Sequence, residues 1–198
     1  MDEAKTTTIH WNDQLEEIIS QEGERALCFS WLHSQCEKQY SAYHSYISLP
    51  TIIFSTLAGS ASIGSQSIFE NTQMANMLIG SVSISVAVLN TVSSFFGWAK
   101  RAEAHRLCGI NYTKIHRFIM IELALPRDER MNAKDMLKVV RDQSDRLQET
   151  SPQISDAIIR RFKKLFGEST PELSKPTITN GLDPIFVYKG ESVRTPLV

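Results

Sequence analysis

Charge is what the sequence lacks most visibly along its first half. Between Lys38 and Lys100 the only Asp, Glu, Lys or Arg is Glu70. Helices at the surface of a soluble protein carry charged residues on the side that faces water, so a segment of this length without them is unusual. Glu70 divides it into two uncharged stretches, each long enough to cross about 30 Å of hydrocarbon as a helix. The sequence therefore predicts two membrane-spanning helices.

Other absences narrow the functional classes. The net charge of -1 gives no bulk attraction to nucleic acid, and no nucleic-acid partner is expected. The acidic, polar start MDEAKTTT has no apolar run behind it, so no cleavable secretory signal is expected. The three cysteines form no CxxC pair, which favours reduced thiols facing a cytosol-like compartment.

Catalytic motifs are also missing from the sequence. It contains no Walker loop, GxSxG, HExxH or paired CxxC motif, and its carboxylates are scattered over predicted solvated helices. An enzyme that works within the membrane needs ionisable residues in its spans, and the predicted spans have none. We expect no enzymatic activity and no cofactor.

We place the two spans at residues 48–67 and 75–98, joined by the short polar connection QSIFENTQMAN, which forces an antiparallel hairpin. Basic residues flank the spans on the side of the two termini: Arg25, Lys38, Lys100, Arg101 and Arg106. The connection has no Lys or Arg, so the positive-inside rule predicts two cytosolic termini and Glu70 on the far side. Either an internal host membrane or a viral membrane fits. The alternative is a soluble all-α bundle that buries both helices, but neither helix has the charged side which that arrangement needs.

The remaining sequence predicts an all-α protein with further cytosolic helices. After a flexible start at 1–11, helical spacing continues over 12–47, and the second span is expected to run without a break into a helix over 99–125. Capping and breaker residues place two more helices at 132–149 and 152–166, which closes a domain over 12–166. Residues 167–198 are rich in proline and read as an extended tail, either disordered or docked on a protein partner.

The predicted helix over 152–166 is amphipathic and basic. Ile154, Ile158, Phe162 and Leu165 form one side, and the basic residues are Arg160, Arg161, Lys163 and Lys164. Such a helix either lies on an anionic cytosolic leaflet or packs its apolar side on the neighbouring helix and leaves its charges solvated. The sequence leaves both readings open.

Small residues recur along each span at alternating steps of three and four. The two seams are Ser48, Thr51, Ser55, Ala58, Ser62 and Ser65, and Gly80, Ser83, Ala87, Asn90, Ser94 and Gly97. Small residues favour helix association in lipid because they let backbones approach. Either the seams face one another within one chain, or part of this surface also faces neighbouring subunits or a water path. Hydroxyls can bond their own helix, but the Asn90 amide needs a partner.

Two His-x-x-Cys pairs, His33 with Cys36 and His105 with Cys108, lie on the helices that continue the spans. In an antiparallel arrangement they fall at similar depth, where two His and two Cys are a possible tetrahedral zinc set. Pairs of this spacing are common by chance, so we expect no metal and keep these four residues as candidates.

The run RAEAHRLCGINYTKIHR at 101–117 follows a small-residue span; a Leu49-Pro50 start opens the first span, and Glu-Thr-Ser-Pro precedes an Ile-Ile-Arg-Arg-Phe helix. With these features the chain resembles the SLATT domains, among them stand-alone members of large DNA viruses and protists, over about residues 14–166. The resemblance implies a two-transmembrane hairpin with cytosolic helices that oligomerises into a membrane-perturbing pore. Four residues match the pattern that recurs after the second span: Glu103, His105, Arg106 and Tyr112. We interpret them as packing residues.

The leading expectation is thus a self-associating integral membrane module that forms a pore or perturbs the bilayer, with lipid and further copies of itself as partners. The alternative is a structural membrane anchor, for example of a viral inner membrane or scaffold, that binds partners through the basic helix and the tail.

Overall fold

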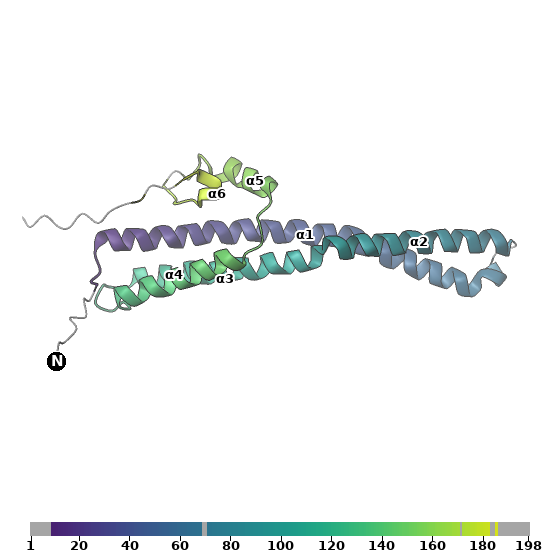
Figure 1. Cartoon of the computed structure of the whole chain (residues 1–198), viewed down its shortest axis with the longest axis horizontal. Helices are drawn as coiled ribbons and strands as arrows, with labels where there is room; N and C mark the ends of the chain where they lie inside the picture. The colour runs from purple at the N-terminus through teal and green to yellow at the C-terminus, as the bar shows by residue number, and fades with distance from the viewer. Residues whose placement is uncertain (1–8, 69–70, 171, 183–184, 186–198) are drawn as a thin grey trace, which may run out of the picture. The chain divides into compact units, whose positions relative to one another are not determined.

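The computed structural model describes residues 9–68, 71–170, 172–182 and 185, with the side chains of 65–68 left out. This part of the chain contains six helices and no strand (Figure 1). They are α1 (Asp13–Ile68), α2 (Thr72–Phe96), α3 (Trp98–Ala124), α4 (Ala133–Thr150), α5 (Asp156–Phe166) and α6 (Thr177–Asn180). The all-helical prediction is confirmed. Glu70, residues 1–8 and the end of the chain after Ile185 lie outside the described residues, as do the expectations made for them.

Polar caps explain where several helices begin. Asn12 Oδ1 accepts a hydrogen bond from Leu15 N at 2.9 Å, and Asn132 Oδ1 accepts one from Lys134 N at 3.0 Å. Asn71 accepts from the backbone of Gln73 and Met74, both at 3.1 Å. Each cap satisfies amide groups that have no partner within the first helical turn.

The predicted unbroken passage from the second span into the following helix is wrong at one residue. Gly97 adopts a left-handed conformation, φ 59° and ψ 36°, and its N–H bonds Ser93 O at 3.0 Å to end α2. Glycine takes this conformation without a steric penalty, so it is the usual residue at a helix C-terminus. The first span shows the opposite behaviour, because α1 continues through Pro50.

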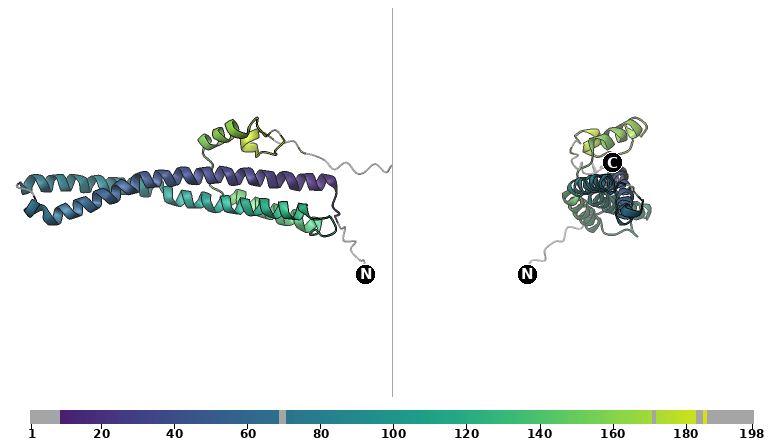
Figure 2. Two further views of the ribbon diagram at one scale, coloured as in Figure 1. Left: turned by 180° about the vertical axis from the view of Figure 1, so that it is seen from behind. Right: turned by 90° about the vertical axis from the view of Figure 1, so that its right-hand side faces the viewer.

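The chain divides into two compact units. Figure 2 shows the ribbon from two further sides. The first comprises residues 1–32, 110–150 and 155–198, and the second comprises 33–109 and 151–154. A single core in the first unit draws side chains from three helices. These residues are Leu15, Ile19 and Ala26 of α1, Tyr112, Ile115 and Ile119 of α3, and Ala133, Met136, Val140 and Leu147 of α4. Spacings of three, four and seven place them on one side of each helix.

Gly23 sets the separation of α1 and α3 within this core. A Cβ at this position would lie 3.0 Å from Ile119 Cγ2. His116 Nδ1 lies 3.0 Å from Gly23 O, so a polar contact accompanies the close approach. The absence of a side chain at Gly23 lets the two helices meet here.

We predict that Gly23→Val lowers the free energy of unfolding by about 2 kcal/mol, because the added methyl groups overpack the core and exceed any gain in helix propensity. Glu17→Val, at an exposed position of the same helix, is the matched control and is expected to change stability by less than about 0.5 kcal/mol. Denaturant unfolding followed by circular dichroism measures both. Equal midpoints for the two variants would show that the contact with Ile119 does not limit the approach.

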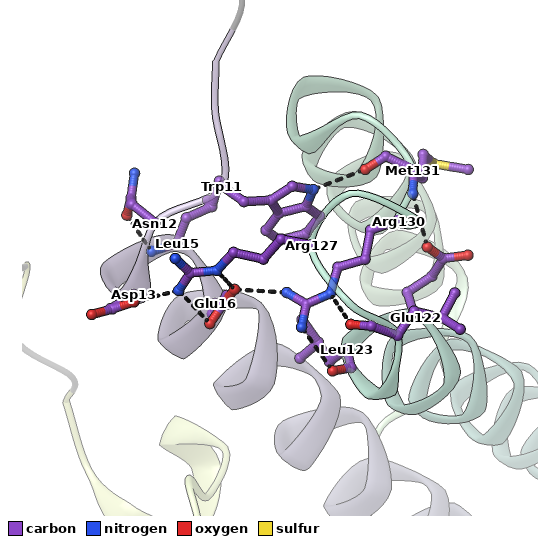
Figure 3. Close-up of polar contacts among 11 residues, drawn as sticks. Trp11, Asn12, Asp13, Leu15, Glu16, Glu122, Leu123, Arg127, Arg130 and Met131 are labelled. Atoms are coloured by element: carbon purple, nitrogen blue, oxygen red, sulfur yellow. Dashed lines mark hydrogen bonds and ion pairs between the residues drawn. The ribbon is translucent and has the colours of Figure 1, made fainter.

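The connection between α3 and α4 is held by Arg130, whose side chain is 10% exposed. Its guanidinium donates to Leu125 O at 2.7 Å and Leu123 O at 3.0 Å, and its Nη1 lies 2.7 Å from Glu16 Oε1 (Figure 3). The same group lies 5.3 Å from the centre of the Trp11 ring, and Trp11 Nε1 donates to Met131 O at 2.9 Å. One cation thus satisfies carbonyls at the end of α3 and ties them to the start of α1.

Part of the predicted extended tail is folded within the first unit. Pro176 and Thr179 are buried; Pro176 directly precedes α6, and Thr179 lies within it. Ser174 N donates to Glu24 Oε2 at 2.7 Å, while the buried Lys175 donates from Nζ to Gly167 O at 3.0 Å. Proline reduces the entropy lost on ordering a short segment, which helps this one to pack without a long helix.

Candidate functional site: the spans and the residues beside them

Two helical stretches are long and apolar enough to cross a membrane, Asp13–Gly64 and Thr72–Ala124. Only 11% of the most apolar window in the first stretch is buried, and none of that in the second. Core helices of a soluble protein are mostly buried, so these values argue against the soluble bundle. Large apolar side chains exposed along them include Leu49, Ile52, Ile53, Leu57, Ile63, Met77, Leu78, Ile84, Val88 and Phe95. A lipid environment removes this surface from water.

Several hydroxyl groups of the spans bond their own helices, as the sequence allowed. Thr51 and Ser55 donate to carbonyls four residues earlier at 2.7 Å. Ser83 and Thr91 do the same in α2 at 2.9 Å. Such bonds make a hydroxyl compatible with hydrocarbon, so these residues call for no further partner.

Asn90 differs from the hydroxyl residues. It is exposed in the last third of α2, six residues before Phe96, and its side-chain amide has no hydrogen-bond partner within the described part of the chain. An amide has two donors and an acceptor, which a helix with all its carbonyls already bonded does not satisfy. In hydrocarbon this group requires a partner from outside the chain or water.

The two predicted seams do not simply face each other. In α2 the exposed positions include Ser83, Ala87, Asn90 and Ser94, while the half-buried side carries Ile79, Val82, Val86 and Leu89. Gly80 and Gly97 at the ends of the seam are half-buried. In the first span Thr51 is buried and Ala58 half-buried, whereas Ser55 and Ser62 are exposed; the side chain of Ser65 lies outside the described residues. Apart from Ala75, which is buried near the start of α2, its inward side is therefore formed mostly by branched apolar residues.

Aromatic rings mark the passage from α2 into α3. Trp98 stacks on Phe96 with ring centres 4.9 Å apart and meets the edge of Tyr43 at 6.3 Å. The ring centres of Tyr43 and Tyr40, about one helical turn apart in α1, are separated by 6.3 Å. Trp and Tyr are enriched at the boundary between hydrocarbon and water, so this cluster is typical of the end of a membrane span.

His33 and His105 meet inside the second unit. Their Nδ1 atoms are 2.8 Å apart, and each residue is 1% exposed. Tyr40 stacks on His105 with centres 5.4 Å apart, and the Arg101 guanidinium lies 6.0 Å from the centre of the Tyr40 ring. Burial, together with the charge of His105, lowers the pKa of His33 to about 4. Burial and then the Arg101 charge lower the pKa of His105.

The four candidate zinc ligands are only partly brought together. Cys36 and Cys108 are buried free thiols in the same unit as the two histidines. In the described residues, however, no group of three or more His, Cys, Asp or Glu side chains has an arrangement that would hold a metal ion. The two histidines use their facing Nδ1 atoms for each other, which takes those atoms from a shared metal.

The predicted motif after the second span divides into buried and exposed residues. Arg106 bonds both Glu103 oxygens at 2.7 Å, and this hydrogen-bonded pairing lowers the pKa of Glu103. Tyr112 is buried in the first unit and stacks on Phe29 at 5.0 Å. With His105 buried as well, two of the four motif residues pack and two form a surface ion pair. Glu103 and Arg106 also line an open cavity of about 200 Å³ beside Glu37 and His44.

The basic helix packs its apolar side. Ile158 and Phe162 are buried, and Trp31 meets Phe162 and Phe166 edge-on at 5.5 and 5.4 Å. The four basic residues are exposed: Arg160, Arg161, Lys163 and Lys164. This arrangement matches the packing reading, with the apolar side of α5 buried and the four basic residues at the surface.

Sequence reasoning missed two features of these sites. The stacking of Tyr40 on His105 depends on a turn of α1 that periodicity alone does not orient, and the role of Arg130 depends on carbonyls in a connection without periodicity. The sequence alone could predict that His33 lies near His105, because residues that face each other in an antiparallel helix pair have a nearly constant sum of residue numbers.

Comparison with known proteins gives one match. The model of the SMODS and SLOG-associating 2TM effector domain family 4 matches residues 15–166, which is most of the chain. No curated protein and no solved structure matches the chain. The two apolar helices, the exposed spans and the family match agree on a membrane protein. The chain belongs to the SLATT effectors, in the SMODS and SLOG-associating 2TM effector domain family 4.

Proposed function

We propose that the protein is a membrane effector that acts by associating with further copies of itself through the exposed small-residue side of α2. In this proposal the two spans form an antiparallel hairpin with both termini in the cytosol. The observation that carries the proposal is the Asn90 amide, which is exposed in the last third of α2 and has no hydrogen-bond partner among the residues that the structure describes.

Lipid cannot supply what Asn90 lacks. Leaving an amide without a hydrogen bond in an apolar medium costs roughly 2–7 kcal/mol, depending on the reference state. A second copy can offer its own Asn90, because an amide is both donor and acceptor. Ser83, Ala87 and Ser94 are small enough to let two such helices approach closely. Association through this side satisfies the amide and needs no change in the inward side of α2.

Association of this kind also accounts for an effect on the bilayer. When several copies close into a ring, part of the polar stripe is placed at subunit contacts and part can face a central water path, where exposed serine hydroxyls are compatible with water. The family is described as a 2TM effector domain, and this description supports an action on the membrane. We propose that the assembled form makes the membrane permeable.

Asn90→Leu tests the proposal, with Val88→Leu as the matched control on another side of the same helix, where Val88 is 55% exposed. We expect Asn90→Leu to weaken association in detergent by about tenfold, the equivalent of 1–2 kcal/mol for an interhelical amide contact, and to reduce dye leakage from liposomes. Val88→Leu is expected to change neither. Light scattering and leakage of a trapped dye measure the two effects.

A wild-type protein that stays monomeric in detergent and leaves liposomes sealed would overturn the proposal. That outcome would favour the membrane anchor, for which the exposed basic side of α5 is the supporting observation. An anchor of this kind binds an anionic partner through charge, so its binding falls as salt increases.

A further inference from the structure

We propose that the buried contact between His33 and His105 is a proton-sensitive switch, which holds α1 to α3 while both imidazoles are neutral and opens when the medium becomes acidic. The inference concerns a contact within one chain. It stands whether or not copies associate through α2.

The geometry of the contact limits how many protons it can hold. With the two Nδ1 atoms 2.8 Å apart, only one hydrogen fits between them. One ring must carry its proton on Nδ1 and donate it, while the other accepts and carries its own proton on Nε2. Protonating the accepting ring places two N–H groups against each other, so the hydrogen bond is lost.

The donating ring can take a proton on its outer nitrogen without losing the bond, but burial opposes this step. Both residues are 1% exposed, and a charged imidazole is poorly solvated there. The closed contact therefore holds at most one added proton, at a cost, whereas two imidazoles in water hold two. Opening takes up protons, and acidification must favour it by linkage.

The titratable and charged groups around the pair do not offset this cost. On α1 they are Tyr40, stacked on His105, and the buried Cys36. On α3 they are Arg101, whose positive charge disfavours a second cation at His105, and the buried Cys108. The segment 151–154 of the same unit has no titratable side chain. Further along the helices, Glu103 is paired with Arg106 and, with Glu37, lines the open cavity.

The sign of the pH effect follows from the lowered pKa values. In the open form each imidazole has a pKa of about 6.5, and in the closed form the pKa of His33 is about 4. The contact is therefore fully stable above about pH 6.5 and is lost progressively as the pH falls towards 4. The proton taken up at His33 between pH 7.5 and 5.5 raises the opening constant by roughly tenfold, and the lowered pKa of His105 adds to this rise.

Amide hydrogen exchange of the full chain in lipid nanodiscs tests the proposal. After correction for intrinsic exchange rates, we expect the opening constant over residues 33–41 and 99–109 to rise by at least roughly tenfold between pH 7.5 and 5.5. The double variant His33→Asn/His105→Asn keeps amide groups near the Nδ1 positions and does not titrate, so its opening constant is expected to stay constant. His44→Asn, a half-buried histidine of the same unit, is expected to behave as the wild type.

A wild-type opening constant that does not change with pH would overturn the proposal, and so would a double variant that keeps the response. A second measurement covers the case in which the double variant fails to fold. Nuclear magnetic resonance of labelled imidazoles in the wild type is expected to show His33 still neutral at pH 5.5 in the closed form. Ordinary titration of both near pH 6.5 without any change in amide protection would contradict the switch.

Discussion

Arg130→Ala is expected to lower the free energy of unfolding of the first unit by about 3 kcal/mol. The guanidinium satisfies Leu123 O and Leu125 O at the end of α3 and pairs with Glu16, all while its side chain is only 10% exposed. Removing it leaves the two carbonyls without this donor and leaves the Glu16 carboxylate with Arg127 alone. The substitution also removes the cation from the face of the Trp11 ring, whose centre lies 5.3 Å from the Arg130 guanidinium.

Arg127→Ala is the matched control, because Arg127 pairs with the same Glu16 carboxylate at 2.6 Å but is 49% exposed. Exposed pairs add little to stability, so its loss is expected to be much smaller than that of Arg130. Arg130→Lys keeps the charge and loses the planar fork, so it should recover only part of the stability. Denaturant unfolding followed by Trp fluorescence measures all three. Equal losses at the two arginines would show that the carbonyl contacts of Arg130 add nothing.

The sequence predicted an all-helical chain with two helices long and apolar enough to cross a membrane, because charge depletion over a long segment and capping residues do not depend on how the helices pack. Asn12, Asn71 and Asn132 each bond backbone amides of a first turn. The span boundaries were less accessible. Gly97 ends α2 through its left-handed conformation, while Pro50 leaves α1 continuous, and either residue alone is compatible with both outcomes.

The sides on which helices pack were harder to predict. Small residues and branched residues alternate around α2, and either set can face inward. The structure places Val82, Val86 and Leu89 on the inward side and leaves Asn90 exposed. The packing of residues 172–182 was also hard to predict from the sequence. Their prolines indicated an extended tail, but the burial of Lys175 and Pro176 depends on Gly167 O and neighbouring side chains, which no local pattern reveals.

Phe162→Ala is expected to release α5 from the first unit. Phe162 is 2% exposed and packs with Trp31 at 5.5 Å and Phe166 at 5.0 Å. Truncating a buried phenylalanine costs about 3–5 kcal/mol through lost burial and the cavity left behind. Since α5 has only 11 residues, it gains little stability from its own helical hydrogen bonds and depends on this contact.

Limited trypsin digestion measures the release directly, because α5 carries four exposed cleavage sites: Arg160, Arg161, Lys163 and Lys164. A docked helix resists cleavage, since the protease needs an extended backbone, so the rate follows the population of the open form. Phe162→Ala is expected to speed cleavage within α5 at least tenfold, whereas Leu165→Ala, at a position 47% exposed, should leave it unchanged. Similar rates in the two variants would mean that burial of Phe162 does not hold the helix. The released helix can then be tested for binding to anionic liposomes. Tighter binding than that of the wild type would show that the apolar side of α5 can pack either on the protein or on lipid, the two environments that suit an amphipathic helix.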